Sequence, residues 1–450
     1  MKVAFITSYY EGDQLDAVTT SFFQHVVSEL GKAGHETVVF ALGDEDFDDL
    51  DSKVFCRKGE LERYNNLHSL ACAPVFSWVF SRAYETYRAH REEVTGYAPD
   101  VVLCVKAIDG MFWSCFEKLP VALMSVTPQF EIMRENFDGN LNPFDTNLVT
   151  AVETAALRSM SAIGCPSEIM RSIIIDAADV PEERTDLYRT AIEPKDQIQP
   201  WSGKTGTPHI VYVGTQERYK GIDVLVDAIP SLVSQFPHAL FTVAGESPPL
   251  FGETISYRDK MRAQLGEFDK HVEWLPALDA DQRASLLAAS DIAAYPFRYC
   301  GCMYHVAEAM SVGAVVVCTA VGTLCECLET GVDVVHTEPG NHRSLAAAIS
   351  DLINDKAQRD RISKAAKEYV RKNHAKEDAV SDVVRLCENA IRNANIPMQE
   401  TSLKYWISAL EDFCQKPYFP DLLNDAYAKG FAAGVASVPT QKRSILSMKR

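Results

Sequence analysis

Short, almost continuously apolar runs recur along the first half of the chain, and stretches with helical spacing lie between them. The runs are KVAFITS (2–8), HETVVFAL (35–42), PDVVLCV (99–105), PVALMSVT (120–127) and SAIGC (161–165). Such runs, alternating with amphipathic helices, are typical of buried strands in a parallel sheet. We expect helices at about 19–33 and 148–160. The pattern predicts a doubly wound α/β domain.

The same alternation begins again in the second half. Strands are expected at 209–215, 240–246, 271–277, 291–297, 314–322 and 333–337, and helices at 222–236, 255–266, 281–289, 341–354 and 356–373. Two doubly wound sheets in tandem place a ligand cleft between them, at the carboxyl ends of their strands. The fold class is therefore predicted as α/β, with two Rossmann-like domains facing a cleft.

Proline, glycine and polar residues gather at 184–208, which indicates an interdomain linker. We expect an N-terminal acceptor domain over 1–195 and a C-terminal donor domain over 209–378. A helical extension over 379–450 should pack back on both, and its clearest helical pieces are 377–393 and 401–413.

Composition narrows the classes of partner. The 450 residues carry a formal net charge of -18, which argues against non-specific nucleic-acid binding. No apolar stretch reaches the ~18 residues that span a bilayer, so no stable membrane insertion is expected. The opening run is too short for a signal peptide, and the 12 cysteines are scattered, so a cytoplasmic location is predicted.

One cysteine-rich loop enters a helix at RYCGCMYHVAEAMSVG (298–313). Glu308 lies on that helix between apolar neighbours, where an unpaired carboxylate is costly, so a role in ligand binding is preferred to that of an ordinary polar helix position. Lys220, at a strand-to-helix turn before Gly221, suits the charge of a phosphate, although a solvated lysine is the plainer alternative. The loop and Lys220 together indicate an anion-binding helix mouth.

Five blocks of the second half carry a family resemblance. They are VYVGTQERYKGIDVLVDAI (211–229), FTVAGE (241–246), VEWLPALDADQRASLLAASDIAAYPF (272–297), HVAEAMSVGAVVVCTAVGTLCECLETGVDVV (305–335) and GNHRSLAAAISDLINDKAQRDRISKAA (340–366). In order and spacing this half resembles the donor domain of family 4 glycosyltransferases (group 1 type) with the GT-B fold. In the first half the similarity is limited to the opening strand and to the short segments GKAGHETVVF (31–40) and PDVV (99–102).

The resemblance implies transfer, with retention, of a sugar from a UDP-, GDP- or ADP-linked donor to a glycan, glycolipid or small-molecule acceptor. It requires no metal or other cofactor. Lys220 and Arg218 would stabilise the leaving diphosphate, and Glu308 would bind the ribose hydroxyls. The donor-binding residues it implies are Gly214, Thr215, Lys220, Glu246, Cys300, Gly301, Cys302, Met303, Tyr304, Glu308 and Glu326.

The chain departs from the family pattern at several positions. Cys300 stands where a sugar-binding glutamate is usual, Met303 replaces a loop glycine, and Thr215 replaces an arginine. A thiol is a weak hydrogen-bonding group, so sugar recognition must differ here. These losses keep two alternatives open. One is a catalytically silent GT-B protein that binds a nucleotide sugar or partners an active transferase, and the other is a sugar phosphorylase or epimerase.

Two further groups of residues are candidates for chemistry. Lys106, Asp109 and Arg134 follow strands of the first half and could bind the acceptor, although loop polarity and helix capping explain them equally simply. Cys300, Cys302, Cys325 and Cys327, with His305 nearby, could hold zinc or an iron–sulfur cluster. The C-x-C spacing is tighter than the usual C-x2-C, so no metal is expected.

Overall fold

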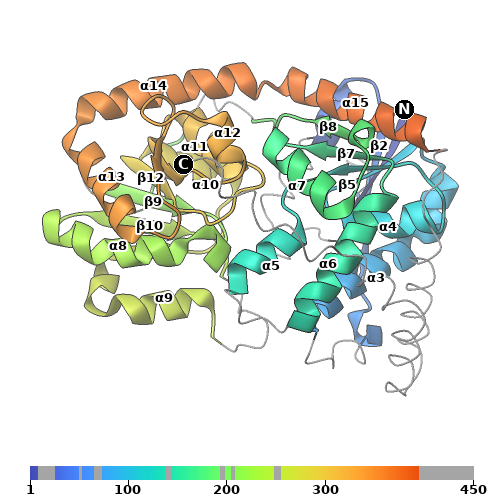
Figure 1. Cartoon of the computed structure of the whole chain (residues 1–450), viewed down its shortest axis with the longest axis horizontal. Helices are drawn as coiled ribbons and strands as arrows, with labels where there is room; N and C mark the ends of the chain where they lie inside the picture. The colour runs from blue at the N-terminus through green and yellow to red at the C-terminus, as the bar shows by residue number, and fades with distance from the viewer. Residues whose placement is uncertain are drawn as a thin grey trace.

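The computed structural model describes residues 1–8, 26–49, 53–64, 73–137, 143–192, 198–203, 208–247 and 255–394. Within these residues the chain forms two sheets, each with helices on both faces (Figure 1). The predicted α/β fold class is confirmed. We call the first sheet with its helices the N-terminal unit and the second the C-terminal unit.

The N-terminal unit is built on an eight-stranded sheet with the order β3-β4-β2-β1-β5-β6-β7-β8, in which only the β3–β4 pairing is antiparallel. Its strands are β1 (Lys2–Thr7), β2 (Glu36–Gly43), β3 (Phe47–Asp49), β4 (Val54–Lys58), β5 (Val101–Cys104), β6 (Val121–Met124), β7 (Ala162–Cys165) and β8 (Thr185–Leu187). Its helices are η2 (Leu61–Tyr64), α3 (Pro74–Tyr97), α4 (Ala107–Cys115), α5 (Gln129–Phe137), α6 (Pro143–Ser159), α7 (Glu168–Ala178) and η3 (Glu182–Arg184).

Alternate residues of these strands enter two different cores, because successive side chains of a strand point to opposite faces. Ala4 and Ile6 of β1 join the core that contains α3, α4, α6 and α7. Val3 and Phe5 join the opposite core, which contains the helical residues 26–32. Both faces of the sheet are therefore covered, which explains the continuous apolar runs in the sequence.

The C-terminal unit has a six-stranded, wholly parallel sheet with the order β11-β10-β9-β12-β13-β14. Its strands are β9 (His209–Val213), β10 (Leu240–Ala244), β11 (Val272–Leu275), β12 (Ile292–Tyr295), β13 (Val316–Thr319) and β14 (Val335–Thr337). Its helices are η4 (Arg218–Lys220), α8 (Ile222–Gln235), α9 (Tyr257–Leu265), η5 (Gly266–His271), α10 (Ala280–Ala288), α11 (Tyr304–Val312), α12 (Thr323–Cys327) and α13 (His342–Asn354). Helices α8, α9 and α13 share one core, and α10 and α11 share the other.

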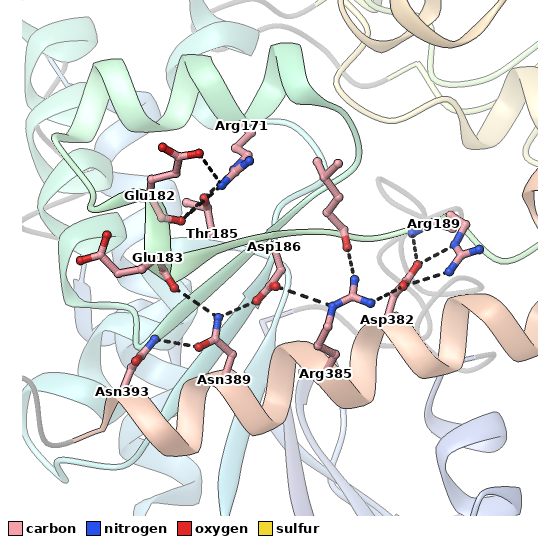
Figure 2. Close-up of polar contacts among 11 residues, drawn as sticks. Arg171, Glu182, Glu183, Thr185, Asp186, Arg189, Asp382, Arg385, Asn389 and Asn393 are labelled. Carbon is pink, nitrogen blue, oxygen red and sulfur yellow. Dashed lines mark hydrogen bonds and ion pairs between the residues drawn. The ribbon is translucent and has the colours of Figure 1, made fainter.

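Two long helices connect the units along one edge of the molecule. Helix α14 (Lys356–Asn373) buries Ala366 and Val370 against the C-terminal sheet, and α15 (Lys376–Asn393) buries Val383 and Leu386 against the N-terminal sheet. Figure 1 shows them running across both units, and Figure 2 shows the polar contacts of α15 with the segment around β8. None of the described helices combines the length and apolar character that a bilayer crossing requires.

Every strand expected from the hydrophobic pattern is present, with ends shifted by a few residues. The interpretation of 184–208 as linker throughout was wrong, because residues 185–187 form β8 and pair with β7. The short β3 and β4 were also missed, since their charged residues obscure the pattern. The helix expected at 19–33 is described only from residue 26, and the helix expected at 401–413 lies outside the described residues.

Candidate functional site

The loops that hold most of the predicted donor residues leave two neighbouring strands, β9 and β12. The connections from these strands run to opposite faces of the sheet, and in doubly wound sheets such a point is where ligands bind, at the carboxyl ends. The loop after β9 contains Gly214 and Lys220, and the loop after β12 contains Cys300 and Met303. The fold therefore brings together residues that are some 80 positions apart in the sequence.

Two glycines allow the loops after β9 and β10 to touch through their backbones. A Cβ on Gly245 would lie 2.0 Å from the carbonyl oxygen of Gly214, and the Gly214 N–H donates to the Ala244 carbonyl at 2.9 Å. The Tyr212 hydroxyl donates to the Thr215 carbonyl at 2.7 Å. Gly214 and Thr215 are thus held in place by backbone contacts, and the loop is closely packed.

Lys220 ends the single turn η4 and lies near the start of α11. Its ammonium sits 4.9 Å from the centre of the Tyr219 ring and 5.0 Å from that of Phe297. No carboxylate of the described residues forms an ion pair with it. Gly221 follows at φ 73°, where a Cβ would lie 1.8 Å from the Pro296 carbonyl oxygen, so only glycine allows this turn. The charge of Lys220 is available to an anion.

The Cys300–Gly301 segment is buried between the two units. Burial raises the pKa of Cys300 to about 12, although the nearby charge of Lys220 opposes the shift. The Cys300 thiol donates to the Cys302 carbonyl at 3.3 Å. A Cβ on Gly301 would lie 2.3 Å from the Val126 carbonyl oxygen of the N-terminal unit, so the loop touches that unit directly. Cys300 is therefore a neutral thiol in a tight interface.

The start of α11 has no side-chain cap among the described residues. Met303 occupies the N-cap position, is 3% exposed and makes no capping hydrogen bond. The Cys302 thiol, just before it, contacts the Thr190 hydroxyl at 3.2 Å and also lies beside the Tyr304 N–H at the start of the helix. Tyr304, the first helical residue, is half-buried beside Arg283. The first-turn N–H groups beyond Tyr304 remain available for an anion, together with the positive end of the helix dipole.

Glu308 forms a buried ion pair with Arg283 of α10. The Arg283 Nε lies 3.0 and 3.2 Å from the two carboxylate oxygens, and its Nη2 lies 2.9 Å from the nearer one. The side chains are 5% and 12% exposed. Burial lowers the pKa of Arg283, but the charge of Glu308 and its hydrogen bonds together outweigh burial and leave the pKa raised. The cost of an unpaired carboxylate, which favoured a ligand at Glu308, is therefore met within the protein by Arg283.

Arg283 was not among the residues predicted from sequence. A usable signal existed, because Arg283 precedes Leu286 and Leu287 by three and four positions and so shares their buried face of α10. A buried arginine requires a carboxylate or several carbonyl partners. The pair leaves one side of the Glu308 carboxylate for further hydrogen bonds, since a carboxylate has about four acceptor sites.

Arg218 and Glu246 each make contacts that hold the fold. The Arg218 Nη1 donates to the Glu135 carbonyl of α5 at 2.7 Å, so this guanidinium joins the two units. The Glu246 carboxylate accepts from the Ala277 N–H at 2.9 Å, after β11. Both lie at the carboxyl edge of the C-terminal sheet, as expected, and each holds a backbone group of another segment.

Glu326 caps a helix of the other unit. Its two oxygens accept from the Glu168 and Ile169 N–H groups at the start of α7, at 2.9 and 2.8 Å. Beside it, the Ser167 and Thr323 hydroxyls are 3.0 Å apart, and Thr323 also donates to the Gly301 carbonyl at 2.6 Å. These contacts join the loop after β13 to the N-terminal unit at the side of the candidate site.

On the N-terminal side, Asp109 occupies the corresponding switch point between β1 and β5. Its carboxylate accepts from the Ser8 hydroxyl at 3.0 Å and from the Ser8 N–H at 3.3 Å. Burial raises the pKa of Asp109, although the nearby charge of Lys106 and the bonds from Ser8 oppose the shift. Arg134 lies apart from this pair on α5, where its guanidinium is held by Glu131 and Glu135.

The four cysteines of the metal hypothesis do not form a ligand set. Among the described residues no group of three or more His, Cys, Asp or Glu side chains is placed to hold a metal ion. Cys302 turns toward Thr190, while Cys325 is exposed and donates to the Gly322 carbonyl at 3.1 Å. The loops after β12 and β13 do meet, as expected, but through backbone and threonine contacts.

Comparison with known sequences agrees with this geometry. Residues 207–355 match the family model described as glycosyl transferases group 1. An uncharacterized glycosyltransferase from Methanocaldococcus jannaschii is 23% identical over 265 residues, 56% of this chain and 66% of that protein. The resemblance to group 1 glycosyltransferases is confirmed. A phosphatidyl-myo-inositol mannosyltransferase from Mycobacterium tuberculosis is 27% identical over 247 residues, 52% of this chain and 58% of that protein. The chain thus spans about half to two thirds of the relatives it matches.

Solved structures show the same architecture. Sucrose-phosphate synthase from Thermosynechococcus elongatus superposes with a TM-score of 0.69 at 16% identity, over 87% of this chain and 99% of that one. The glycosyltransferase WaaG, involved in lipopolysaccharide biosynthesis, gives 0.61 at 15% identity, over 88% and 100%. HepE from Anabaena in complex with UDP and glucose gives 0.61 at 17% identity, over 86% and 99%. The expected GT-B fold is confirmed.

Proposed function

We propose that this protein is a retaining glycosyltransferase that moves a sugar from a nucleotide-diphosphate sugar to a glycan, glycolipid or small-molecule acceptor. The observation that carries the proposal is the ammonium of Lys220, which has no ion pair among the described residues and lies beside the start of α11, where the N-cap residue Met303 makes no side-chain hydrogen bond. The group 1 match over 207–355 covers this position.

The chemistry follows from charge. When the bond between the sugar and the diphosphate breaks, negative charge grows on the leaving phosphate oxygen. A lysine and a helix N-terminus fixed beside that oxygen stabilise the charge without rearrangement, which lowers the barrier. Within the proposal, the free side of the Glu308 carboxylate accepts from the two ribose hydroxyls, and its pairing with Arg283 holds the carboxylate in a fixed orientation.

The acceptor is proposed to bind at the N-terminal unit. Asp109 lies at the switch point of that sheet, where Ser8 fixes its carboxylate and Lys106 lies close enough to influence its charge. A buried carboxylate is suited to accept a hydrogen bond from an acceptor hydroxyl. Arg134 is the weaker candidate, because two carboxylates of its own helix already hold it.

A second candidate function is nucleotide-sugar binding without turnover. Cys300 favours it, since the thiol occupies the position of the usual sugar-binding carboxylate and is buried with its pKa raised to about 12. Such a thiol can neither accept strongly from sugar hydroxyls nor supply charge. The two candidates make the same prediction for binding and opposite predictions for transfer.

Calorimetric titration with UDP-glucose, GDP-mannose and ADP-glucose tests the binding that both candidates require. Two of the superposing structures are described as holding UDP-glucose or UDP-2-fluoro glucose, so UDP-glucose is the first probe. We expect Lys220→Ala to weaken binding of the bound donor by roughly 10- to 100-fold, since a charged hydrogen bond is lost. The exposed Lys270→Ala is the matched control and should bind like the wild type.

Donor hydrolysis then separates the candidates. Slow release of free sugar, initially with the anomeric configuration of the donor as followed by NMR, supports a retaining transferase, whereas tight binding without release supports the silent protein. If none of the three donors binds or is hydrolysed, and Lys220→Ala behaves like the wild type, both are rejected.

A further inference from the structure

The candidate site contains a buried histidine to which the proposed chemistry assigns no role. His305 is the second residue of α11 and is 8% exposed. Its Nδ1 has no hydrogen-bond partner among the described residues. A buried polar atom without a partner is unfavourable, and native structures rarely retain one without a ligand, water or functional reason.

His305 lies close to the place proposed for the diphosphate. Residues three apart on a helix share a face, so His305 lies on the face of Glu308, one turn nearer the start of α11. Its Cε1 lies 3.8 Å from where a Cβ on Gly214 would be, which places the ring under the loop after β9. The ring therefore lies between the helix mouth and the loop that leads to Lys220.

The charged and titratable groups around the ring come from several elements. Lys220 at the end of η4 and Arg283 of α10 act on it electrostatically, while Glu308 lies on its own helix. The Tyr295 ring of β12 stacks on it with centroids 6.5 Å apart, and the Tyr304 ring meets it edge-on at 6.3 Å. Burial, then Lys220, then Arg283 lower the pKa of His305 well below its usual value. The imidazole is therefore neutral at pH 7 without ligand.

We propose that His305 is a further donor-binding residue, whose Nδ1 contacts the diphosphate of the nucleotide sugar and which takes up one proton from solvent as that diphosphate binds. The proposal rests on the proposed function. A diphosphate carrying two negative charges offsets the repulsion from Lys220 and Arg283, and so favours the imidazolium. Neutral imidazole, one proton and the donor give an imidazolium–diphosphate pair, with no other bond made or broken.

Proton uptake has a measurable sign. Because the complex holds one more proton than the free protein and donor, the affinity for the donor falls as the pH rises. The diphosphate of a nucleotide sugar is a diester that does not itself titrate near neutral pH, so the proton must enter the protein. A structural histidine would show no such linkage.

Calorimetry with UDP-glucose, GDP-mannose and ADP-glucose at pH 7, each in phosphate and in Tris buffer, counts the protons taken up. For the donor that binds, we expect uptake approaching one proton by the wild type and the exposed control His238→Asn. His305→Asn keeps a hydrogen-bond donor near the Nδ1 position but cannot titrate, so uptake should vanish while affinity falls only a few-fold. His305→Leu should lose uptake and roughly tenfold or more in affinity.

Equal uptake and affinity in wild type, His305→Asn and His305→Leu would overturn the proposal, as would binding by the wild type without uptake. If the Leu variant does not fold, as judged by thermal unfolding, the Asn variant alone decides through its proton count. If Nδ1 instead binds a water shared with the buried Tyr295 hydroxyl, the two His305 substitutions should change stability and leave donor affinity unaffected. That result would also overturn the proposal. Absence of donor binding by the wild type instead rejects the proposed function.

Discussion

At the residue scale, burial decides the chemistry of the cysteines around the candidate site. Cys300 is 5% exposed and its pKa is raised to about 12, so almost no thiolate forms near neutral pH. Cys325, only 25 positions later, is exposed at the start of α12. The sequence shows two similar C-x-C pairs, but the fold gives them different environments.

We predict that iodoacetamide at pH 8 alkylates Cys325 faster than Cys300 by on the order of 100-fold or more, because the thiolate is the reacting species. Tandem mass spectrometry that separates the two positions follows both rates in one sample. Unfolding in urea is the control, where the rates should converge. Similar rates in the folded protein would show that Cys300 is accessible and ionisable.

At the element scale, three carboxylates cap helices that are distant in the sequence. Asp145 accepts from two N–H groups at the start of α3, Glu153 does so for α5, and Glu326 does so for α7. Burial raises the pKa of Glu153 to about 7, although the hydrogen bonds that it accepts oppose the shift. Helix α5 in turn contacts η4, where Asn136 accepts from the Tyr219 N–H at 2.8 Å.

The raised pKa of Glu153 predicts a dependence of stability on pH. The folded state binds this proton more tightly than the unfolded chain, so the contribution of Glu153 to stability falls as the pH rises from about 4.5 to about 7. Relative to Glu153→Gln, the wild type should lose up to about 3 kcal/mol of unfolding free energy over that range. Urea unfolding at pH 5 and pH 8 measures it, and a difference independent of pH would contradict the prediction.

The exposed Asp176→Asn on α7 is the control for that experiment. Its difference from the wild type should be small at both pH values, because a solvent-exposed carboxylate has little to lose on folding. A similar pH dependence in both variants would indicate that the effect belongs to the net charge and not to the buried cap.

At the scale of the whole molecule, α15 returns the chain from the C-terminal unit to the N-terminal sheet. Asp382 of α15 is 3% exposed and accepts from the Arg189 N–H, Nε and Nη2 at 3.1, 2.8 and 3.1 Å. Arg385 adds an ion pair to Asp382 at 3.0 Å, and Asn389 donates to Asp186 of β8 at 2.7 Å (Figure 2). These contacts fasten α15 to the edge strand β8.

We predict that Asp382→Asn lowers the unfolding free energy by about 2 kcal/mol at pH 7, because hydrogen bonds to a charged acceptor are lost beside a sheet edge. Although burial opposes it, the bonds from Arg189 leave the pKa of Asp382 lowered, so this stabilisation is present above about pH 4 and is lost as the pH falls through the lowered pKa. Urea unfolding of wild type and variant at pH 7 and pH 3 measures both effects.

Asp378→Asn provides the matched control, since Asp378 pairs with the same arginine at 2.9 Å but is half exposed. An exposed ion pair contributes about 0–1 kcal/mol, so this variant should remain close to the wild type. Equal losses for the two variants would show that the buried hydrogen bonds of Asp382 are not what stabilises the docking of α15.

The sequence alone determined the strands except β3, β4 and β8, most helices, the two tandem sheets, and the positions of Lys220 at a turn and Glu308 on a helix, because hydrophobic period and turn residues act locally. It also showed that Glu308 needed a partner. Only the tertiary structure decided that this partner is Arg283, that Glu326 caps α7, and that His305 keeps a buried Nδ1 without a partner. Those facts depend on which loops come together at the carboxyl edges of the two sheets. Local residue spacing does not reveal such contacts between segments that are distant in the sequence.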